Sequence, residues 1–562
     1  MKRLFFLVLL FVPLVFITCF DNGDGSVKTT DEIIVKPKTF ESYLHFEFMD
    51  AKTGVPLRGK EVSLTVKGKD AALVYNNLGQ KESVYTTKAG FYDFMIDVAK
   101  ATGDFVISTS CDGYENNIQR VRLQQGAKFT TVQAKLLKLN NLPDGISVAP
   151  PVTFTTNGQG QTDKEVIINA NTLNAVRIPQ GVTLKDAGGK TVTGKVDAKV
   201  MFFTPNESVE YFPGGLDVET VDANGQSQNS AFISAGAFDI QLTSGNTPVK
   251  TIDGKGFELT TVLDPELINP ETGNPVVEGD KIPLWSMDSE TAVWKLEKTA
   301  VIKKNANGQL YLSEEINHLS TWNWDWSINS CYLGATIKWE GNFSDGVNVK
   351  VTNSSSMNYH KEMVVRADKN DPLQVMFVPS NIPMTVAFEG VCGSDLTFVP
   401  QTLEIPNMCE GTFPVQIIQK ASSTQTIYTV NVDINVSAKS NPNLRLSAYA
   451  WVYFYKTCDY AYQSFYVNDG KFSASVEPGT DYIFNISLGQ AWGYGYLRVD
   501  DIGGNKLRIR FSPEYSYYFD ANWNYWNLDI PKQEITIDKP ANNVITISNH
   551  FTIEDSVLTA LM

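Results

Sequence analysis

Short runs that alternate apolar and polar residues recur from residue 43 almost to the end of this chain. In "YLHFEFMD" (43–50), for example, Leu44, Phe46 and Phe48 occupy every second position. A strand places alternate side chains on opposite faces, so this period predicts a sheet with one apolar face. Gly, Asn and Asp residues separate the runs, and we find no long amphipathic helix after the N-terminal segment. The pattern therefore predicts an all-β chain of tandem β-sandwiches.

The first residues, "MKRLFFLVLLFVPLVFITC", are typical of an export signal. Two basic residues precede an apolar run from Leu4 to Ile17, which is short for a membrane span, so a cleaved signal peptide (1–18) is expected. Cys19 closes the run and the polar "FDNGDGS" follows, which resembles the signal of bacterial lipoproteins. The resemblance implies lipidation of Cys19 and attachment to the outer membrane. The alternative is an ordinary secretory signal that contains a cysteine by chance. The acidic "DNGDG" also resembles the export tags of surface lipoproteins in Bacteroidota.

The length of 562 residues is too great for one hydrophobic core, so several domains are expected. Changes in composition and in the alternating pattern suggest where one part ends and the next begins. The expected parts are a signal peptide (1–18), the lipidated Cys with a flexible tether (19–40), a first β-sandwich (41–140), a middle β-domain (141–329), a further β-sandwich (330–421) and an aromatic-rich C-terminal β-domain (422–562).

Two stretches carry a family resemblance. "FEFMDAKTGVPLRGKEVSLTV", "TTKAGFYDFMI" and "FVISTSCDGYENNIQRVRL" follow one another in the first sandwich and resemble the carboxypeptidase regulatory-like domain. That resemblance implies a small transthyretin-like fold, with Gly54 and Gly113 in tight turns that need positive φ. It implies no peptidase activity, because the regulatory label comes from neighbouring peptidases. Tandem sandwiches of Ig-like or transthyretin-like type are therefore expected throughout.

The middle domain contains "SAGAF" (234–238) and "PLWSMDSETAVW" (283–294), and ends in "HLSTWNWDW" (318–326). These motifs resemble a region shared by bacterial surface proteins and cartilage intermediate layer protein, which implies an extracellular scaffold. Trp322, Trp324 and Trp326 stand at every second position, so they share one strand face. They could stack a flat ligand or fill a core. We expect the core, with Trp285 and Trp294 of the preceding hairpin packed on the same face.

The C-terminal domain is unusually aromatic, as in "YAWVYFYKTCDYAYQSFYV" (449–467). A Tyr and Trp face of this kind is either a junction between domains or a surface that stacks sugars. The candidate ligand-stacking residues are Tyr449, Trp451, Tyr453, Trp492, Trp523 and Trp526.

Five cysteines remain after Cys19, and Cys392 and Cys409 are a possible disulfide pair across a short loop. The four histidines lie far apart and no metal-binding motif is present, so no metal and no cofactor are expected. We find no catalytic constellation and do not expect an enzyme.

The charge balance bears on partners. Lys and Arg total 47 against 62 Asp and Glu, a formal net charge of -15, which disfavours nucleic acid. The expected function is a lipid-anchored, non-catalytic scaffold or adhesion and display protein at the cell surface, with the membrane and other surface proteins as partners. The alternative is a glycan-binding surface lipoprotein of a polysaccharide-capture system that stacks sugars on the C-terminal aromatic residues.

Overall fold

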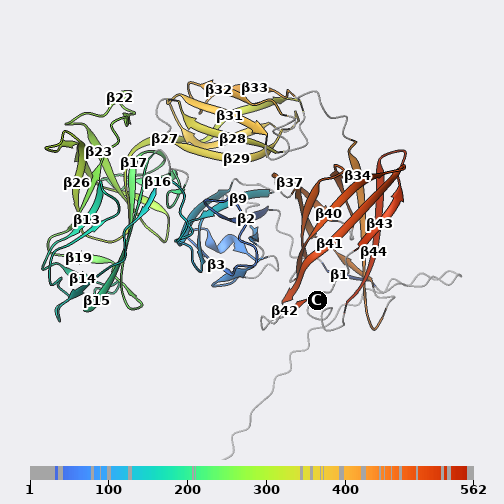
Figure 1. Ribbon diagram of the computed structural model, residues 1–562, viewed down its shortest axis with the longest axis horizontal. Coiled ribbons are helices and arrows are strands. Elements are labelled where there is room, and N and C mark those ends of the chain that lie inside the picture. The colour runs from blue at the N-terminus through green and yellow to red at the C-terminus, as the bar shows by residue number, and fades with distance from the viewer. Residues whose placement is uncertain are drawn as a thin grey trace, which may run out of the picture.

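The computed structural model is a chain of strands grouped into packed sheets (Figure 1). It describes residues 32–35 and 42–553, except for 77–80, 89, 98–102, 124–128, 206–207, 209–210, 342–345, 355–358, 368, 371, 391–397, 419–425, 442–444, 449, 457–458, 468–470, 489–490, 520–524 and 528–532. Within this part the single helical element is the 3₁₀ turn η1 (Ala71–Leu73). The expected all-β fold of tandem β-sandwiches is confirmed.

The first sandwich packs two four-stranded sheets, in the orders β4-β6-β2-β9 and β5-β3-β7-β8. Leu44, Phe46 and Phe48 are fully buried between them, as the alternation predicts. Gly54 and Gly113 have φ values of 65° and 79°, which confirms the two turns. The strands are β2 (Ser42–Asp50), β3 (Val62–Lys67), β4 (Val74–Tyr75), β5 (Tyr85–Thr87), β6 (Phe91–Ile96), β7 (Gly103–Cys111), β8 (Asn117–Leu123) and β9 (Phe129–Leu136).

The middle part has a large sheet in the order β10-β15-β17-β16-β24-β23-β27, with a second sheet β12-β13-β20-β26-β25. Short pairings complete it, among them β11 and β18 at the edges and the pairs β14-β19 and β21-β22. Its strands before β27 are β10 (Ile146–Val148), β11 (Val152–Thr156), β12 (Val166–Asn169), β13 (Asn174–Ile178), β14 (Thr183–Lys185), β15 (Gly194–Phe203), β16 (Asp217–Val221), β17 (Ser227–Ser244), β18 (Thr247–Pro248), β19 (Thr251–Asp253), β20 (Phe257–Val262), β21 (Ile268–Asn269), β22 (Asn274–Pro275), β23 (Lys281–Met287), β24 (Val293–Val301), β25 (Lys303–Lys304) and β26 (Leu310–Ile316).

Strand β27 (Thr321–Glu340) belongs to two modules. Its first half pairs with β17 as far as Asn329, and its second half pairs with β30 from Ser330 onward. The boundary expected after residue 329 therefore falls inside one unbroken strand. The third sandwich consists of this second half with β30 and β33, packed on the sheet β29-β28-β31-β32. Its other strands are β28 (Gly346–Asn353), β29 (His360–Arg366), β30 (Leu373–Pro379), β31 (Met384–Gly390), β32 (Gln401–Ile405) and β33 (Thr412–Gln416).

The C-terminal module also packs two sheets, with Val430, Leu497 and Ile545 in the core between them. One sheet holds β34, β35, β38 and β44, and the other runs β37-β36-β39-β40-β41-β42 with β43 beside β41. The strands are β34 (Tyr428–Ala438), β35 (Arg445–Ala448), β36 (Ala450–Lys456), β37 (Asp459–Val467), β38 (Lys471–Val476), β39 (Asp481–Leu488), β40 (Ala491–Gly503), β41 (Lys506–Phe519), β42 (Tyr525–Asn527), β43 (Gln533–Asp538) and β44 (Val544–Ile553).

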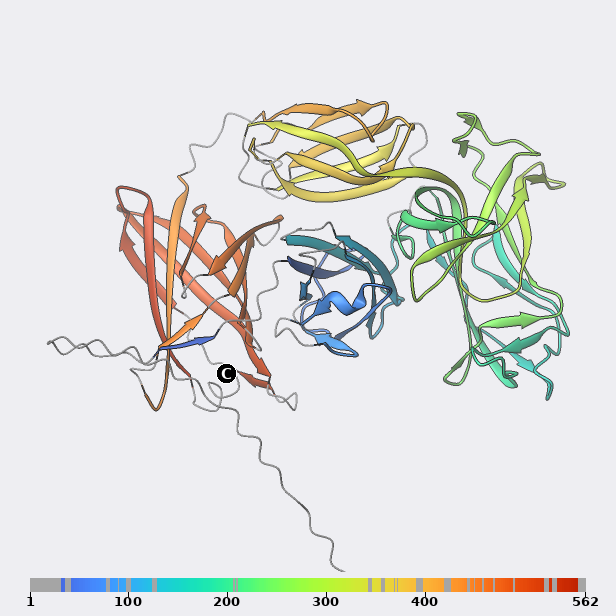
Figure 2. The ribbon, with the colours of Figure 1, turned by 180° about the vertical axis from the view of Figure 1, so that it is seen from behind.

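A short N-terminal strand, β1 (Glu32–Val35), joins this last module. It pairs in parallel with β35, so the first described strand completes a sheet formed by residues near the end of the chain (Figure 2). The sequence placed these residues inside a flexible tether (19–40). For residues 32–35 that expectation is wrong, because their backbone forms a ladder with β35.

Candidate functional site at the junction of three modules

The tryptophan row of β27 is core. Trp322, Trp324 and Trp326 are each 2% exposed or less. The indole Nε1 of Trp324 donates a hydrogen bond to Thr261 Oγ1 at 3.0 Å, which places the row against the second middle sheet. His318 packs on the Trp322 ring with centroids 4.6 Å apart. The row therefore offers no open face to a flat ligand, and the expectation of a structural role is confirmed.

Trp285 and Trp294 lie on the other face of the same sheet. The register pairs Trp285 with Asn323, whose side chain points away from the tryptophan row, and both indoles pack on Phe232. The expectation that they share the row's face is wrong. A β-bulge between Leu284 and Trp285 accompanies this register, and local sequence does not encode it.

The side chains of the C-terminal aromatic candidates are not among those that the structure describes. Tyr449 and Trp523 fall outside the described residues, and for Trp451, Tyr453, Trp492 and Trp526 only the backbone is described. Trp451 on β36 and Trp492 on β40 both pair with Ser487 of β39, the strand that lies between them. A stacking surface in this module stays a prediction.

The cysteine pairing differs from the one expected. Cys331 on β27 forms a disulfide with Cys409, with Cα atoms 5.6 Å apart. A Cys392–Cys409 bond is therefore wrong, because the Cys409 sulfur is already bonded. Cys111 is a buried free thiol, and burial raises its pKa. Cys19, Cys392 and Cys458 lie outside the described residues.

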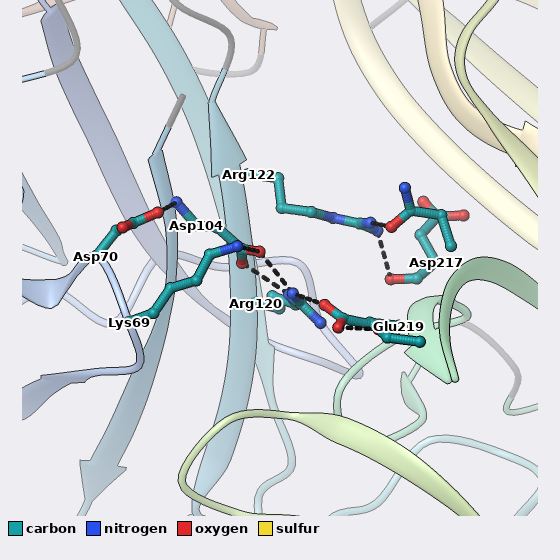
Figure 3. A network of polar contacts seen from close by, with 9 residues as sticks. Lys69, Asp70, Asp104, Arg120, Arg122, Asp217 and Glu219 are labelled. Atoms are coloured by element: carbon teal, nitrogen blue, oxygen red, sulfur yellow. Dashed lines mark hydrogen bonds and ion pairs between the residues drawn. The ribbon is translucent and has the colours of Figure 1, made fainter. Parts of the chain in front are cut away.

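A network of polar side chains lies where the first sandwich meets the middle sheet (Figure 3). Arg120 on β8 donates from Nε and Nη2 to the Asp104 carboxylate, at 2.8 and 2.6 Å. The same Nη2 also contacts the carboxylate of Glu219 on β16. The Arg120 side chain is only 7% exposed. A buried guanidinium thus bridges a carboxylate of its own module and one of the next.

Two further residues hold Asp104 in place. Its backbone N–H donates to Asp70 Oδ2 at 2.9 Å, and Lys69 Nζ lies 3.4 Å from its Oδ2. Burial alone would raise the pKa of Asp104, but the hydrogen bonds and charge of Arg120, helped by Lys69, outweigh it and lower that pKa. The pKa of Glu219 is lowered in the same way: burial alone would raise it, but the hydrogen bonds from the Ser227 hydroxyl and Arg120 and the charge of Arg120 outweigh burial. Both acids are therefore held as carboxylates.

Arg122 links the same strand to a third module. It donates from Nη1 to Asn229 Oδ1 at 2.7 Å and from Nη2 to the Asp217 carbonyl at 3.2 Å. Its guanidinium lies 3.8 Å from the centroid of the Phe377 ring, on β30 of the third sandwich. A cation on an aromatic face is attractive and shields the guanidinium from water.

The third sandwich returns contacts of its own. Lys361 on β29 forms an ion pair with Asp217, and the Tyr359 hydroxyl donates to Asp217 Oδ1 at 2.9 Å. Lys135 on β9 reaches Glu362 at 3.3 Å, which connects the first and third sandwiches directly. The first sandwich, the middle sheet and the third sandwich therefore meet pairwise at one junction.

The local sequence explains how these strands present charge. On β8, Val121 and Leu123 are buried in the core of the first sandwich, so the residues between and beside them, Arg120 and Arg122, project from the opposite face. On β16, Asp217 and Glu219 alternate in the same way with buried Val218. Sequence reasoning missed this junction. The available signal was the pair of basic residues and the pair of acidic residues, each at a spacing of two in a strand.

A second contact between the first sandwich and the middle sheet borders a cavity of about 690 Å³. Gln241 Nε2 donates to Glu115 Oε1 at 2.9 Å and to Asp239 Oδ2 at 2.7 Å, and Lys199 pairs with Glu115. Thr321 Oγ1 donates to Asp239 at 2.9 Å. The contacts of Glu115 with Gln241 and Lys199 cross the module boundary, as expected of a structural contact.

In the described part of the chain, no group of three or more His, Cys, Asp or Glu side chains is arranged to hold a metal ion. None of the described residues form a helix with the length and apolar character that a membrane span requires.

No protein-family model matches the chain, and no curated protein matches it. Among solved structures, it is similar to the Bacillus anthracis TIE protein, with 9% identity over 80% of this chain and 55% of that one, at a TM-score of 0.13. It is also similar to the major pilin SpaD of Corynebacterium diphtheriae, with 7% identity over 92% and 97% of the two chains and a TM-score of 0.13.

A third similar structure is a pair of B repeats from the collagen binding protein of Staphylococcus aureus, with 12% identity over 82% and 96% and a TM-score of 0.12. The chain spans about half the length of the Bacillus anthracis protein. TM-scores this low carry no argument about the fold or function of this chain.

Proposed function

We propose that this chain is a non-catalytic, lipid-anchored protein of the cell surface that serves as a scaffold or adhesion and display module. The observation that carries the proposal is strand β27, which runs from the middle sheet into the third sandwich without a linker. A continuous strand paired on both sides of a module boundary resists bending there, because a bend would break ladder hydrogen bonds.

The charged junction supports the same role. Arg120 and Lys361 form ion pairs across module boundaries that are largely shielded from water. Arg122 adds a hydrogen bond from the first sandwich to the middle sheet and a cation–ring contact with the third sandwich. Interfaces between domains of one chain usually leave them free to move unless the contact is extensive. Here a shared strand and a network together favour one stiff block. The charged groups of the network contact one another, which suits a structural role better than catalysis.

Attachment to the membrane rests on Cys19. The apolar run ends at this residue and a polar segment follows, the arrangement of a lipoprotein signal. A lipid chain would anchor the protein at the surface of the outer membrane, where a stiff array of β-sandwiches can present a binding face to other surface molecules.

Small-angle scattering of the chain from residue 20 onward tests stiffness. We expect one narrow distribution of sizes, and a broader one in the double variant Arg120→Ala/Lys361→Ala. Arg177→Ala, which removes an exposed arginine bound to Glu165 and Glu258 within the middle part, is the matched control and should leave the distribution unchanged. A broad distribution in the unmodified chain would contradict the proposal.

Metabolic labelling with a fatty-acid analogue tests the anchor. We expect labelling of the full-length protein in its host and its loss, with release from membranes, in Cys19→Ala. Labelling that persists in Cys19→Ala would show that the anchor lies elsewhere.

A further inference from the structure

The N-terminal strand β1 lies far from the module that follows it in sequence. Residues 32–35 pair in parallel with 445–448, whereas β2, which begins at Ser42, belongs to the first sandwich. The N-terminal strand therefore sits in the last module of the chain (Figures 1 and 2). The partner strand β35 is paired on its other side with β34, so β1 covers what would otherwise be an open sheet edge.

We infer that β1 is a staple that docks the anchored end of the chain onto the C-terminal module, so that this module faces the membrane. This inference rests on the lipid anchor proposed above. Thirteen residue steps separate Cys19 from Glu32, and at 3.3–3.6 Å per residue they span at most about 45 Å. The lipid is thereby confined to the neighbourhood of the C-terminal module.

Docking of β1 reverses the order of the modules from the membrane outward that the sequence suggests. A tether leading straight into the first sandwich would place that sandwich next to the membrane and the C-terminal module at the far end. With β1 docked, the C-terminal module lies nearest to the bilayer. Seven residue steps then connect Val35 to Ser42. They can span about 25 Å at most. The block formed by the other three modules is the part presented outward.

The staple also joins both ends of the described chain in one sheet. Strand β44 pairs in parallel with β34 along its whole length, and β34 pairs in turn with β35. A force applied at the lipid would therefore reach the C-terminal module through β1, before it reaches the linker to the first sandwich. This sheet is the attachment point of the whole molecule.

Hydrogen exchange tests the docking without any lipid. In the chain from residue 20 onward, the variant Ile33→Pro/Ile34→Pro removes two consecutive N–H groups, one of which faces β35 in either orientation of the strand. Among residues 445–448, we expect exchange of the amides that face β1 to rise about tenfold or more. The control Val27→Pro/Lys28→Pro, upstream of β1, should leave it unchanged. Equal exchange in the two variants would overturn the docking.

Energy transfer tests the orientation. The chain from residue 20 onward, carrying an N-terminal hexahistidine tag, is held on vesicles with nickel-chelating lipids and a membrane-bound acceptor dye. A donor is placed at Lys471 in the C-terminal module or at Lys281 in the middle sheet, both exposed, through a bio-orthogonal amino acid that spares the native cysteines. We expect higher transfer from Lys471, and a smaller difference in Ile33→Pro/Ile34→Pro.

Equal or higher transfer from Lys281 would overturn the orientation. Because the tag replaces the lipid, this result is independent of whether Cys19 is acylated. Failure of fatty-acid labelling would instead remove the proposed anchor and leave the docking of β1 intact.

Discussion

The guanidinium of Arg120 contacts the carboxylate of Glu219, 99 residues further along the chain, and thereby joins the first sandwich to the middle sheet. The two side chains are 7% and 24% exposed. Because Arg120 also holds Asp104, its loss would deprive two partly buried carboxylates of their shared cation and leave Asp104 with Lys69. The cost of removing this residue therefore comes mainly from the groups it leaves behind.

Arg120→Ala should destabilise the first sandwich and its contact with the middle sheet by roughly 3 kcal/mol, the lower part of the range for breaking a buried ion pair. Calorimetric melting of the chain from residue 20 onward measures it. The stability of Arg120→Lys should lie between that of the unmodified chain and that of Arg120→Ala, because an ammonium group keeps the charge but cannot form the paired bonds to Asp104. Unchanged melting of Arg120→Ala would show that the junction contributes nothing to stability.

Acid should loosen the same junction. The pKa values of Asp104 and Glu219 are lowered in the folded protein, by Arg120 and their other partners against the effect of burial. The unfolded chain then binds more protons, so the stability that these two groups contribute is complete above about pH 5 and is lost as the pH falls through the lowered values. Melting temperatures measured between pH 7 and pH 3 should drop more steeply for the unmodified chain than for Arg120→Ala. Parallel curves would contradict this assignment.

A large part of this architecture follows from local sequence. The period-two runs predict the strands, and the one-sided row at Trp322, Trp324 and Trp326 predicts a buried face. Strand partners do not follow, because register is set by contacts between distant segments. The prediction that Trp285 shares the face of Trp322, Trp324 and Trp326 is wrong for this reason.

The junction and the staple were missed for the same reason. Arg120, Glu219 and Lys361 come from three separate modules, and each is an ordinary charged strand residue by itself. Residues 32–35 are too few to show a strand pattern, and their partners lie more than 400 positions away.

Asp325 should make the middle sheet less stable as pH rises. It is fully buried, and burial raises its pKa well above the usual value despite hydrogen bonds from Ser234, the Ala235 N–H and Asn323. The folded protein then binds more protons than the unfolded one, so stability falls above about pH 4 by up to about 1.4 kcal/mol per pH unit. Asp325→Asn, which cannot ionise, should melt higher than the unmodified chain at pH 8 and lose this advantage near pH 4. A constant difference at all pH values would argue against a protonated Asp325.

Trp324→Ala should destabilise the middle part by roughly 3–5 kcal/mol, the usual cost of emptying a buried aromatic site. Its side chain is fully buried, and the indole N–H donates to Thr261. Trp324→Phe keeps much of the packing but leaves Thr261 without its donor, so a smaller loss is expected. Chemical unfolding followed by fluorescence measures both. Unchanged stability in Trp324→Ala, with loss of binding to a ligand, would mean that the row is a binding platform after all.

The partner of Cys409 is Cys331 in the structure, whereas the sequence suggests Cys392. The Cys331–Cys409 bond closes a loop with a sequence separation of 78 and ties β27 to the segment before β33. Constraining the unfolded chain over a loop of that length stabilises a fold by roughly 4 kcal/mol. Cys331→Ser and Cys409→Ser should therefore lower the melting temperature of the third sandwich equally, while Cys392→Ser leaves it unchanged. Peptide mapping without reduction should recover Cys331 joined to Cys409. If Cys392→Ser and Cys409→Ser were instead the matching pair, the shorter loop expected from sequence would be the correct one.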